Sequence, residues 1–128
     1  MCKKLLIIML LVMVGWCYAE ARDYITLSGN IGPYTIVMKI DPTADSGTNC
    51  GYYYYTDKKH PRRVNFNLVM GKYDQINFHG SVKMTLYEFS PSGKNTGTFR
   101  GQLECSSGWY SGTFTNSKGK KYRFELYE

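Results

Sequence analysis

Residues 82–89 read VKMTLYEF, and this stretch decides the fold class because its apolar and polar side chains alternate. Val82, Met84 and Leu86 fall on one face of an extended chain, whereas Lys83 and Thr85 fall on the other. A period of two is typical of a half-buried antiparallel strand. The same alternation recurs in three further runs: YTIVMKI (34–40), VNFNLVM (64–70) and YRFELYE (122–128).

Turn-forming residues separate these runs at short intervals. Gly, Pro, Asn, Asp and Ser are concentrated in DPTADSGTN (41–49), SPSGKN (90–95) and NSKGK (116–120). We therefore predict an all-β antiparallel meander of eight or nine strands. A long twisted meander avoids exposed edges by closing into a barrel, which we favour, or by folding into a two-sheet sandwich.

The runs GTFRGQL (97–103) and YSGTFTN (110–116) each place a glycine between two large residues of the same face. Such a glycine weakens a flat strand but suits a sharply coiled one. We interpret the repeated pattern as a device of barrel closure and not as a domain duplication.

Residues 1–21, MCKKLLIIMLLVMVGWCYAEA, have the order of a secretory signal peptide: basic, apolar, then small residues. The apolar run from Leu5 to Val14 is shorter than the roughly 20 residues that span a bilayer, so a retained anchor is the alternative. Cleavage after Ala19 or Ala21 leaves one domain over residues 22–128 without a transmembrane span. We predict an exported protein, either periplasmic or secreted.

Two of the four cysteines, Cys50 and Cys105, remain after this cleavage. An even number of cysteines in an exported chain predicts a disulfide between them. The alternative is a pair of buried thiols.

Much of residues 50–127 resembles a pattern of small exported bacterial proteins of unassigned function. The pattern joins the strand YYYY (52–55), the hairpin GKNTGTFRG (93–101) and SGTFTNSKGKK (111–121). The six residues SGTFTN are also similar to strands of avidin-type barrels. None of the biotin-contacting residues can be placed here, so this resemblance implies a barrel and not biotin binding.

Sequence patterns of catalytic and metal sites are missing. The chain contains no GxSxG, HExxH or Gly-rich phosphate loop. His60 lies in a turn and His79 on the polar face of its run, and neither has a metal-spaced Cys or carboxylate partner. We therefore expect no enzymatic activity, no cofactor and no metal.

Twelve tyrosines make the chain rich in aromatic residues, and four of them are consecutive. If Cys50 points inward, alternation sends Tyr52 and Tyr54 inward and Tyr53 and Tyr55 outward. Inward tyrosines are core residues or line a ligand cavity. Outward ones form cross-strand pairs or a stacking platform for a sugar or peptide.

Tyr110 should point inward and Trp109, on the opposite parity, outward. The candidates for ligand binding are Tyr52, Tyr54 and Tyr110. The candidates for surface interaction are Tyr53, Tyr55, Lys58, Lys59, Arg62, Arg63 and Trp109.

Basic residues gather at two predicted hairpin tips: Lys58, Lys59, Arg62 and Arg63 at one, and Lys118, Lys120, Lys121 and Arg123 at the other. We expect residues 50–57 and 62–70 to pair, with Lys58 to Pro61 as the tip. These tips are either solvated or bind an anionic partner. Residues 1–21 hold two of the 16 Lys and Arg and one of the 10 Asp and Glu, so the remaining excess is small. The small excess of positive charge and the export signal both argue against a nucleic acid as the partner.

Two function classes follow. The first is a non-catalytic protein that binds a small ligand in or near the barrel mouth. The second is an interaction protein, such as an inhibitor or adhesin, that uses aromatic residues and basic tips against an extracytoplasmic macromolecule. A tyrosine-lined cavity favours the first class, whereas a packed interior with a contiguous exposed Tyr/Trp patch favours the second.

Overall fold

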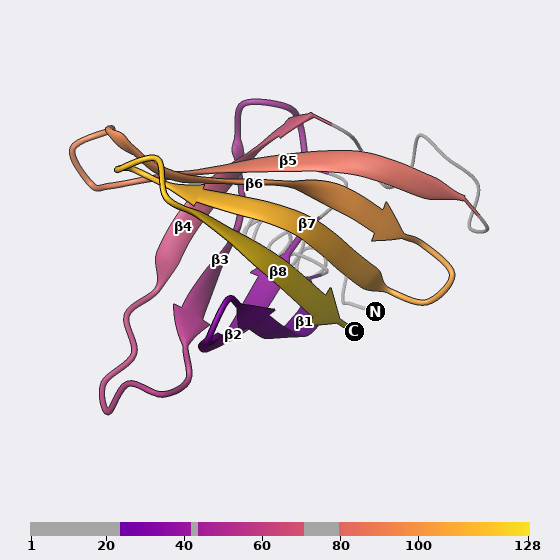
Figure 1. Cartoon of the computed structure of the whole chain (residues 1–128). Coiled ribbons are helices and arrows are strands. Elements are labelled where there is room, and N and C mark those ends of the chain that lie inside the picture. Colours follow the sequence, from indigo (N-terminus) through magenta and orange to yellow (C-terminus); the bar gives the residue numbers. More distant parts are fainter. Residues whose placement is uncertain (1–23, 42–43, 71–79) are drawn as a thin grey trace, which may run out of the picture.

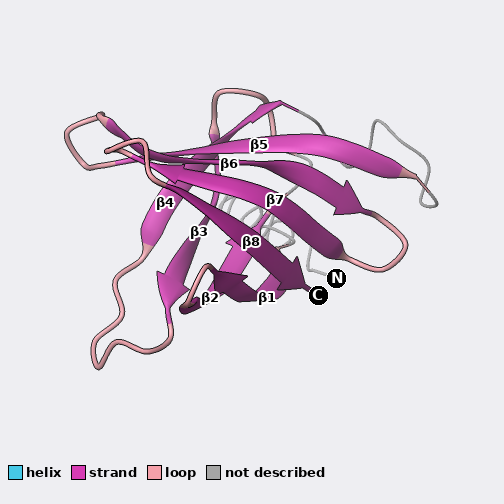
Figure 2. Cartoon of the chain, viewed as in Figure 1, coloured by secondary structure: helices cyan, strands magenta, loops and turns pink. Residues whose placement is uncertain are grey.

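The computed structural model describes residues 24–41, 44–70 and 80–128, which fold into a closed antiparallel barrel (Figure 1). Its strands are β1 (Ile25–Ile31), β2 (Tyr34–Ile40), β3 (Asn49–Tyr55), β4 (Val64–Met70), β5 (Ser81–Phe89), β6 (Asn95–Glu104), β7 (Trp109–Asn116) and β8 (Lys121–Tyr127). Each strand pairs with the next, and β8 pairs with β1 to close the sheet. Figure 2 shows strands and loops as the only elements of the described part. The predicted all-β barrel is confirmed, with eight strands.

The signal peptide and the position of His79 lie outside the described residues. Within the described ranges, no helix has the length and apolar character needed to cross a membrane.

The barrel interior is one apolar cluster, as the alternating runs predict. Met84 and Leu86 of β5 are fully buried, as are Phe124 and Leu126 of β8. Phe99 lies at the centre of the packed rings. The other fully buried side chains include Leu27, Ile36, Met38, Ile40, Phe66, Leu103 and Tyr110.

Gly101 of β6 and Gly112 of β7 face each other across the sheet. A Cβ atom on Gly112 would lie 2.1 Å from the backbone oxygen of Arg100, and one on Gly101 would lie 2.1 Å from that of Ser111. The ring of Phe124 occupies the space beside Gly101, because its Cζ would be 2.8 Å from that Cβ. The two strands therefore approach so closely at this point that only glycine fits at positions 101 and 112.

The hairpin of β3 and β4 forms as predicted, but the orientation of its tyrosines was predicted wrongly. The pairing of the two strands shifts between Asn49 and Gly51, which is a β-bulge. A bulge adds one residue to one strand, so Cys50 and Gly51 are both buried and the alternation reverses beyond them. Tyr53 is therefore buried, at 1% exposure, while Tyr52 and Tyr54 are partly exposed.

The predicted disulfide is not formed, and the structure has Cys50 and Cys105 as buried thiols. Each thiol contacts a nearby backbone carbonyl: Cys50 Sγ lies 3.7 Å from the oxygen of Phe66, and Cys105 Sγ lies 3.9 Å from that of Leu103. Cys50 belongs to β3 and Cys105 follows β6, so β4 and β5 intervene in the sheet order. The alternative of two buried thiols therefore describes this pair.

Candidate binding site at the basic end of the barrel

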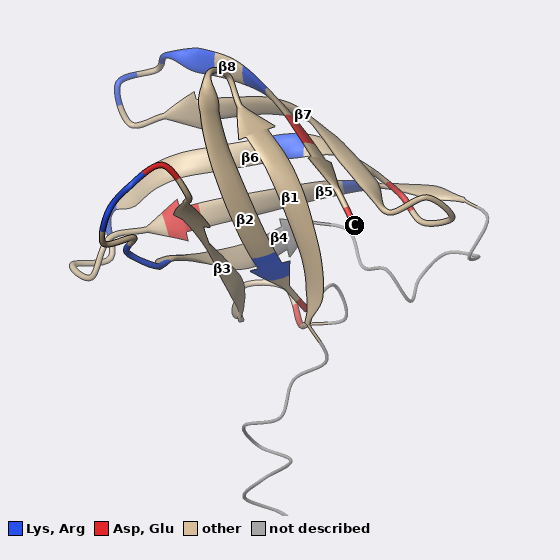
Figure 3. Cartoon of the chain, turned by 90° about the horizontal axis from the view of Figure 1, so that it is seen from below, with Lys and Arg blue, Asp and Glu red and all other residues tan. Residues whose placement is uncertain are grey.

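The strand order brings the two predicted basic tips to the same end of the barrel. In an up-and-down barrel, every loop from an odd-numbered strand to the next even-numbered strand lies at one end. We call the end formed by the β1–β2, β3–β4, β5–β6 and β7–β8 loops the basic end (Figure 3). Its exposed cations are Lys58, Lys59, Arg62, Arg63, Lys94, Lys118, Lys120 and Lys121.

Carboxylates do not balance these cations. The acidic residues at the basic end are Asp57, which is exposed, and Glu88, which is 7% exposed. Among the residues that the structure describes, none of the eight cations forms an ion pair with a carboxylate, and Arg123 pairs with Glu125 on the wall of the barrel. The basic end therefore presents an uncompensated positive field to solvent.

Tyrosine rings lie under two of these cations. The guanidinium carbon of Arg63 is 4.3 Å from the ring centre of Tyr52, and Lys120 Nζ is 5.2 Å from that of Tyr122. A cation over an aromatic face is attracted by the ring quadrupole. Tyr52 and Arg63 also line a groove of about 350 Å³, together with Tyr54 and Pro61. The rings hold the cations close to the barrel while leaving their charge exposed.

A carboxylate is buried just inside the basic end. The hydroxyl of Tyr53 donates a hydrogen bond to Glu88 Oε2 at 2.5 Å, and Thr96 Oγ1 donates one to Glu88 Oε1 at 3.0 Å. Burial raises the pKa of Glu88, although the hydrogen bonds from Tyr53 and Thr96 lower it in part. Burial and the neighbouring Glu88 raise the pKa of Tyr53 far above its usual range, so its phenol stays protonated and donates.

Four tyrosine rings connect this buried pair to the surface. Tyr53, Tyr55, Tyr34 and Tyr122 meet edge to face in that order, with ring centres 5.6, 6.0 and 6.1 Å apart. Burial raises the pKa of Tyr55, while a hydrogen bond with Tyr53 lowers it in part. Tyr34 is 42% exposed and lines a groove of about 240 Å³ with Tyr55 and Lys58.

A third groove, with a volume of about 550 Å³, is larger than these two and runs between the β3–β4 loop and the β5–β6 turn. Arg62 and Arg63 line it from the loop, Phe89 from the end of β5 and Pro91 from the turn. Glu88 is also part of its lining, although its side chain is buried, so this groove borders the buried carboxylate. The site combines two guanidinium groups, an apolar ring and a carboxylate acceptor.

The predicted site residues divide into two groups. Eight of the ten gather at the basic end: Tyr52, Tyr53, Tyr54, Tyr55, Lys58, Lys59, Arg62 and Arg63. Trp109 and Tyr110, at the start of β7, lie toward the opposite end.

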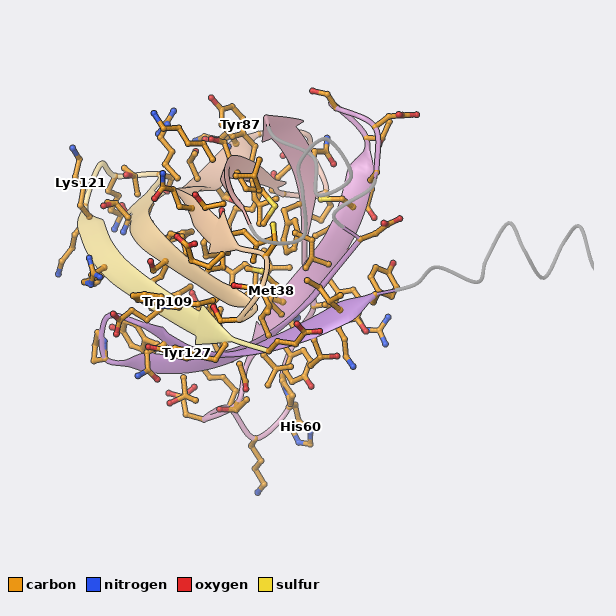
Figure 4. The ribbon with its side chains drawn as sticks, turned by 90° about the vertical axis from the view of Figure 1, so that its right-hand side faces the viewer. Met38, His60, Tyr87, Trp109, Lys121 and Tyr127 are labelled. Carbon is orange, nitrogen blue, oxygen red and sulfur yellow. The ribbon has the colours of Figure 1, made fainter. Side chains whose placement is uncertain are left out.

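Tyr110 is fully buried, and its hydroxyl donates to the backbone oxygen of Met84 at 2.7 Å, so it is a core residue. The rings of Trp109 and Tyr127 stack on the outer face, with their centres 6.0 Å apart and their planes 4° from parallel (Figure 4).

Sequence reasoning missed Glu88 and Thr96. Glu88 could have been found, because it continues the inward parity of Val82, Met84 and Leu86 and so is a carboxylate on an apolar face. Thr96 carries no comparable signal, since threonine is ordinary on a strand surface.

No family model matches the chain, and no curated protein or solved structure matches it significantly.

The raised pKa of Glu88 predicts a specific dependence of stability on pH. The folded chain holds the Glu88 proton more tightly than the unfolded chain, whose carboxyl has an ordinary pKa near 4.5. This group therefore makes the protein less stable as the pH rises from that value through the raised pKa. We expect Glu88→Gln to lack this loss, so that its free energy of unfolding increases relative to wild type across the window. Denaturant unfolding at several pH values measures the difference, and parallel pH curves for the two proteins would contradict it.

Proposed function

We propose that the chain is an exported, non-catalytic binding protein whose basic end holds an anionic extracytoplasmic macromolecule. The observation that carries this proposal is the set of eight exposed cations that the strand order collects at one end, where no carboxylate of the described ranges pairs with them. A field of one sign attracts oppositely charged partners and speeds their association. Seven of the cations belong to three different loops and Lys121 begins β8. This spread suits an extended polymer better than a single small ion.

The packing of the barrel also favours binding at its end and not inside it. Phe99 contacts Tyr53, Phe114 and Phe124 at ring distances of 4.7 to 5.3 Å, and these rings fill the interior. Each of the three grooves described above has at least one residue of the basic end in its lining. A small ligand held in the barrel mouth remains the second candidate, supported by the groove that reaches Glu88.

The double variant Lys58→Ala/Lys59→Ala tests the proposal, with heparin as a polyanion probe. We expect about tenfold weaker binding at low salt, and a log–log salt dependence that is shallower by about two, because two counterion-releasing contacts are lost. Isothermal titration at several salt concentrations measures both quantities. The free energy of unfolding should change by less than about 1 kcal/mol, since both side chains are exposed.

The matched control is Lys39→Ala/Lys83→Ala, which removes the same charge from the strand ends opposite the basic end. This control should keep most of the affinity. Equal losses in the two double variants would mean that net charge alone attracts heparin, and the proposed site would then be wrong.

A further inference from the structure

A carboxylate in the middle of the basic end needs its own explanation. Glu88 repels anions, and burying its charge is unfavourable unless partners satisfy it. Tyr53 and Thr96 each supply one donor. Neutral residues at these three positions would fill the same space without the desolvation penalty, so the arrangement does not serve packing alone. Buried polar groups with a shifted pKa beside a groove are typical of a binding site.

The hydrogen-bonding capacity of Glu88 indicates which groups it would accept. A carboxylate offers about four lone-pair positions and has no donor of its own. The bonds from Tyr53 and Thr96 use one position on each oxygen, so each oxygen retains acceptor capacity, and Glu88 is part of the groove lining. A ligand hydroxyl can donate to such an oxygen, whereas an ionised phosphate cannot. Glu88 therefore selects for anions that also carry hydroxyl groups.

The other residues that line the groove indicate which further groups its ligand carries. Arg62 and Arg63 carry planar guanidinium groups, which match the geometry of a carboxylate. Phe89 is half-buried and is part of the groove lining. An aromatic ring packs well against the C–H face of a pyranose, which is apolar. Hydroxyl groups, a carboxylate and an apolar ring face occur together in an acidic sugar.

We propose that the groove lined by Arg62, Arg63, Glu88 and Phe89 is a subsite for a uronic acid unit of an acidic polysaccharide. The sugar carboxylate lies at the arginines, its hydroxyls donate to Glu88, and one face of its ring packs on Phe89. This assignment rests on the proposed function and specifies the class of its anionic partner. A polymer of phosphate or phosphodiester groups meets the same cations but is repelled by Glu88.

The test compares polygalacturonate with inorganic polyphosphate, at matched charge concentration and salt, on the wild-type protein and on Glu88→Gln. Gln has nearly the same size as Glu but removes the negative charge and half of the acceptor capacity. We expect the wild type to bind polygalacturonate more tightly. In Glu88→Gln, the affinity for polygalacturonate should fall about tenfold, the effect of losing a hydrogen bond to a charged group. The affinity for polyphosphate should stay constant or rise.

Two further variants keep the test decisive if Glu88→Gln folds poorly. Phe89→Ala should weaken polygalacturonate binding by about threefold to tenfold, within the range of a lost aromatic contact, and leave polyphosphate binding unchanged. Lys94 lies in the β5–β6 turn and is not part of the groove lining. Lys94→Ala should therefore lower the affinity for both polymers by the same factor.

The outcomes separate this inference from the proposed function. Tighter binding of both polymers to Glu88→Gln, or a wild-type preference for polyphosphate, would overturn the sugar subsite and leave the basic end as an anion site. Failure of the wild type to bind either polymer at low salt would overturn both.

Discussion

Tyr53→Ala is expected to lower the free energy of unfolding by about 3–5 kcal/mol, the usual range for removing a large buried aromatic side chain. Tyr53 is 1% exposed, and its ring contacts Phe66 and Phe99 in the centre of the barrel. The substitution also leaves Glu88 Oε2 without its phenolic donor. Denaturant unfolding monitored by circular dichroism measures the change.

Tyr54→Ala is the matched control, because it removes the same side chain from the next position of β3. Tyr54 is partly exposed on the outer face, so its loss should cost only about 1 kcal/mol. A third variant, Tyr53→Phe, keeps the ring and removes the hydroxyl, which should cost about 1–3 kcal/mol because Glu88 loses a buried partner. If Tyr54→Ala were the more damaging of the two alanine variants, the bulge at Gly51 would not reverse the alternation.

The second large effect is expected from Gly112→Ala, which should lower the free energy of unfolding by about 3 kcal/mol, the upper end for an added methyl group in a packed site. The new Cβ would lie 2.1 Å from the backbone oxygen of Arg100 and 2.5 Å from the Cα of Gly101. Both contacts are with backbone, so β6 and β7 would have to separate. Thermal and denaturant unfolding measure the loss.

Gly119→Ala is the control for this variant. Gly119 lies in the β7–β8 turn with a φ of +82°, and a Cβ atom added there would have no neighbouring atom within 4 Å. Its replacement should cost about 1 kcal/mol through backbone strain alone. Similar losses in the two variants would show that the close approach of β6 and β7 is not what requires glycine at position 112.

The fold was largely predictable because strand periodicity is a local property. In β5, the inward positions of Met84 and Leu86 follow directly from the alternation in VKMTLYEF. Turn residues such as those of 90–95 mark where each strand ends, and an even number of meandering strands can close. The glycine pattern of β6 and β7 added the expectation of tight coiling.

The candidate site was predictable only in part. The basic residues and the four tyrosines of β3 were recognised, but the inward and outward tyrosines were exchanged. The bulge between Asn49 and Gly51 is a property of how β3 pairs with β4, and no local pattern in CGYYYY reveals it. The prediction of a disulfide was wrong for a related reason, since the number of cysteines says nothing about where two side chains point.

By itself, the sequence determined the strands, the turns between them and the positive charge of two hairpin tips, because each depends on residues within a few positions of one another. Tertiary structure alone decided that Tyr53 is inside, that Glu88 receives hydrogen bonds from β3 and β6, and that Arg62 and Arg63 lie across a groove from Phe89. Most of these contacts join residues more than 20 positions apart in the sequence. The exception is the hydrogen bond between Thr96 and Glu88, which spans one turn. They depend on strand register and barrel closure, which place distant side chains together only when the whole sheet has formed.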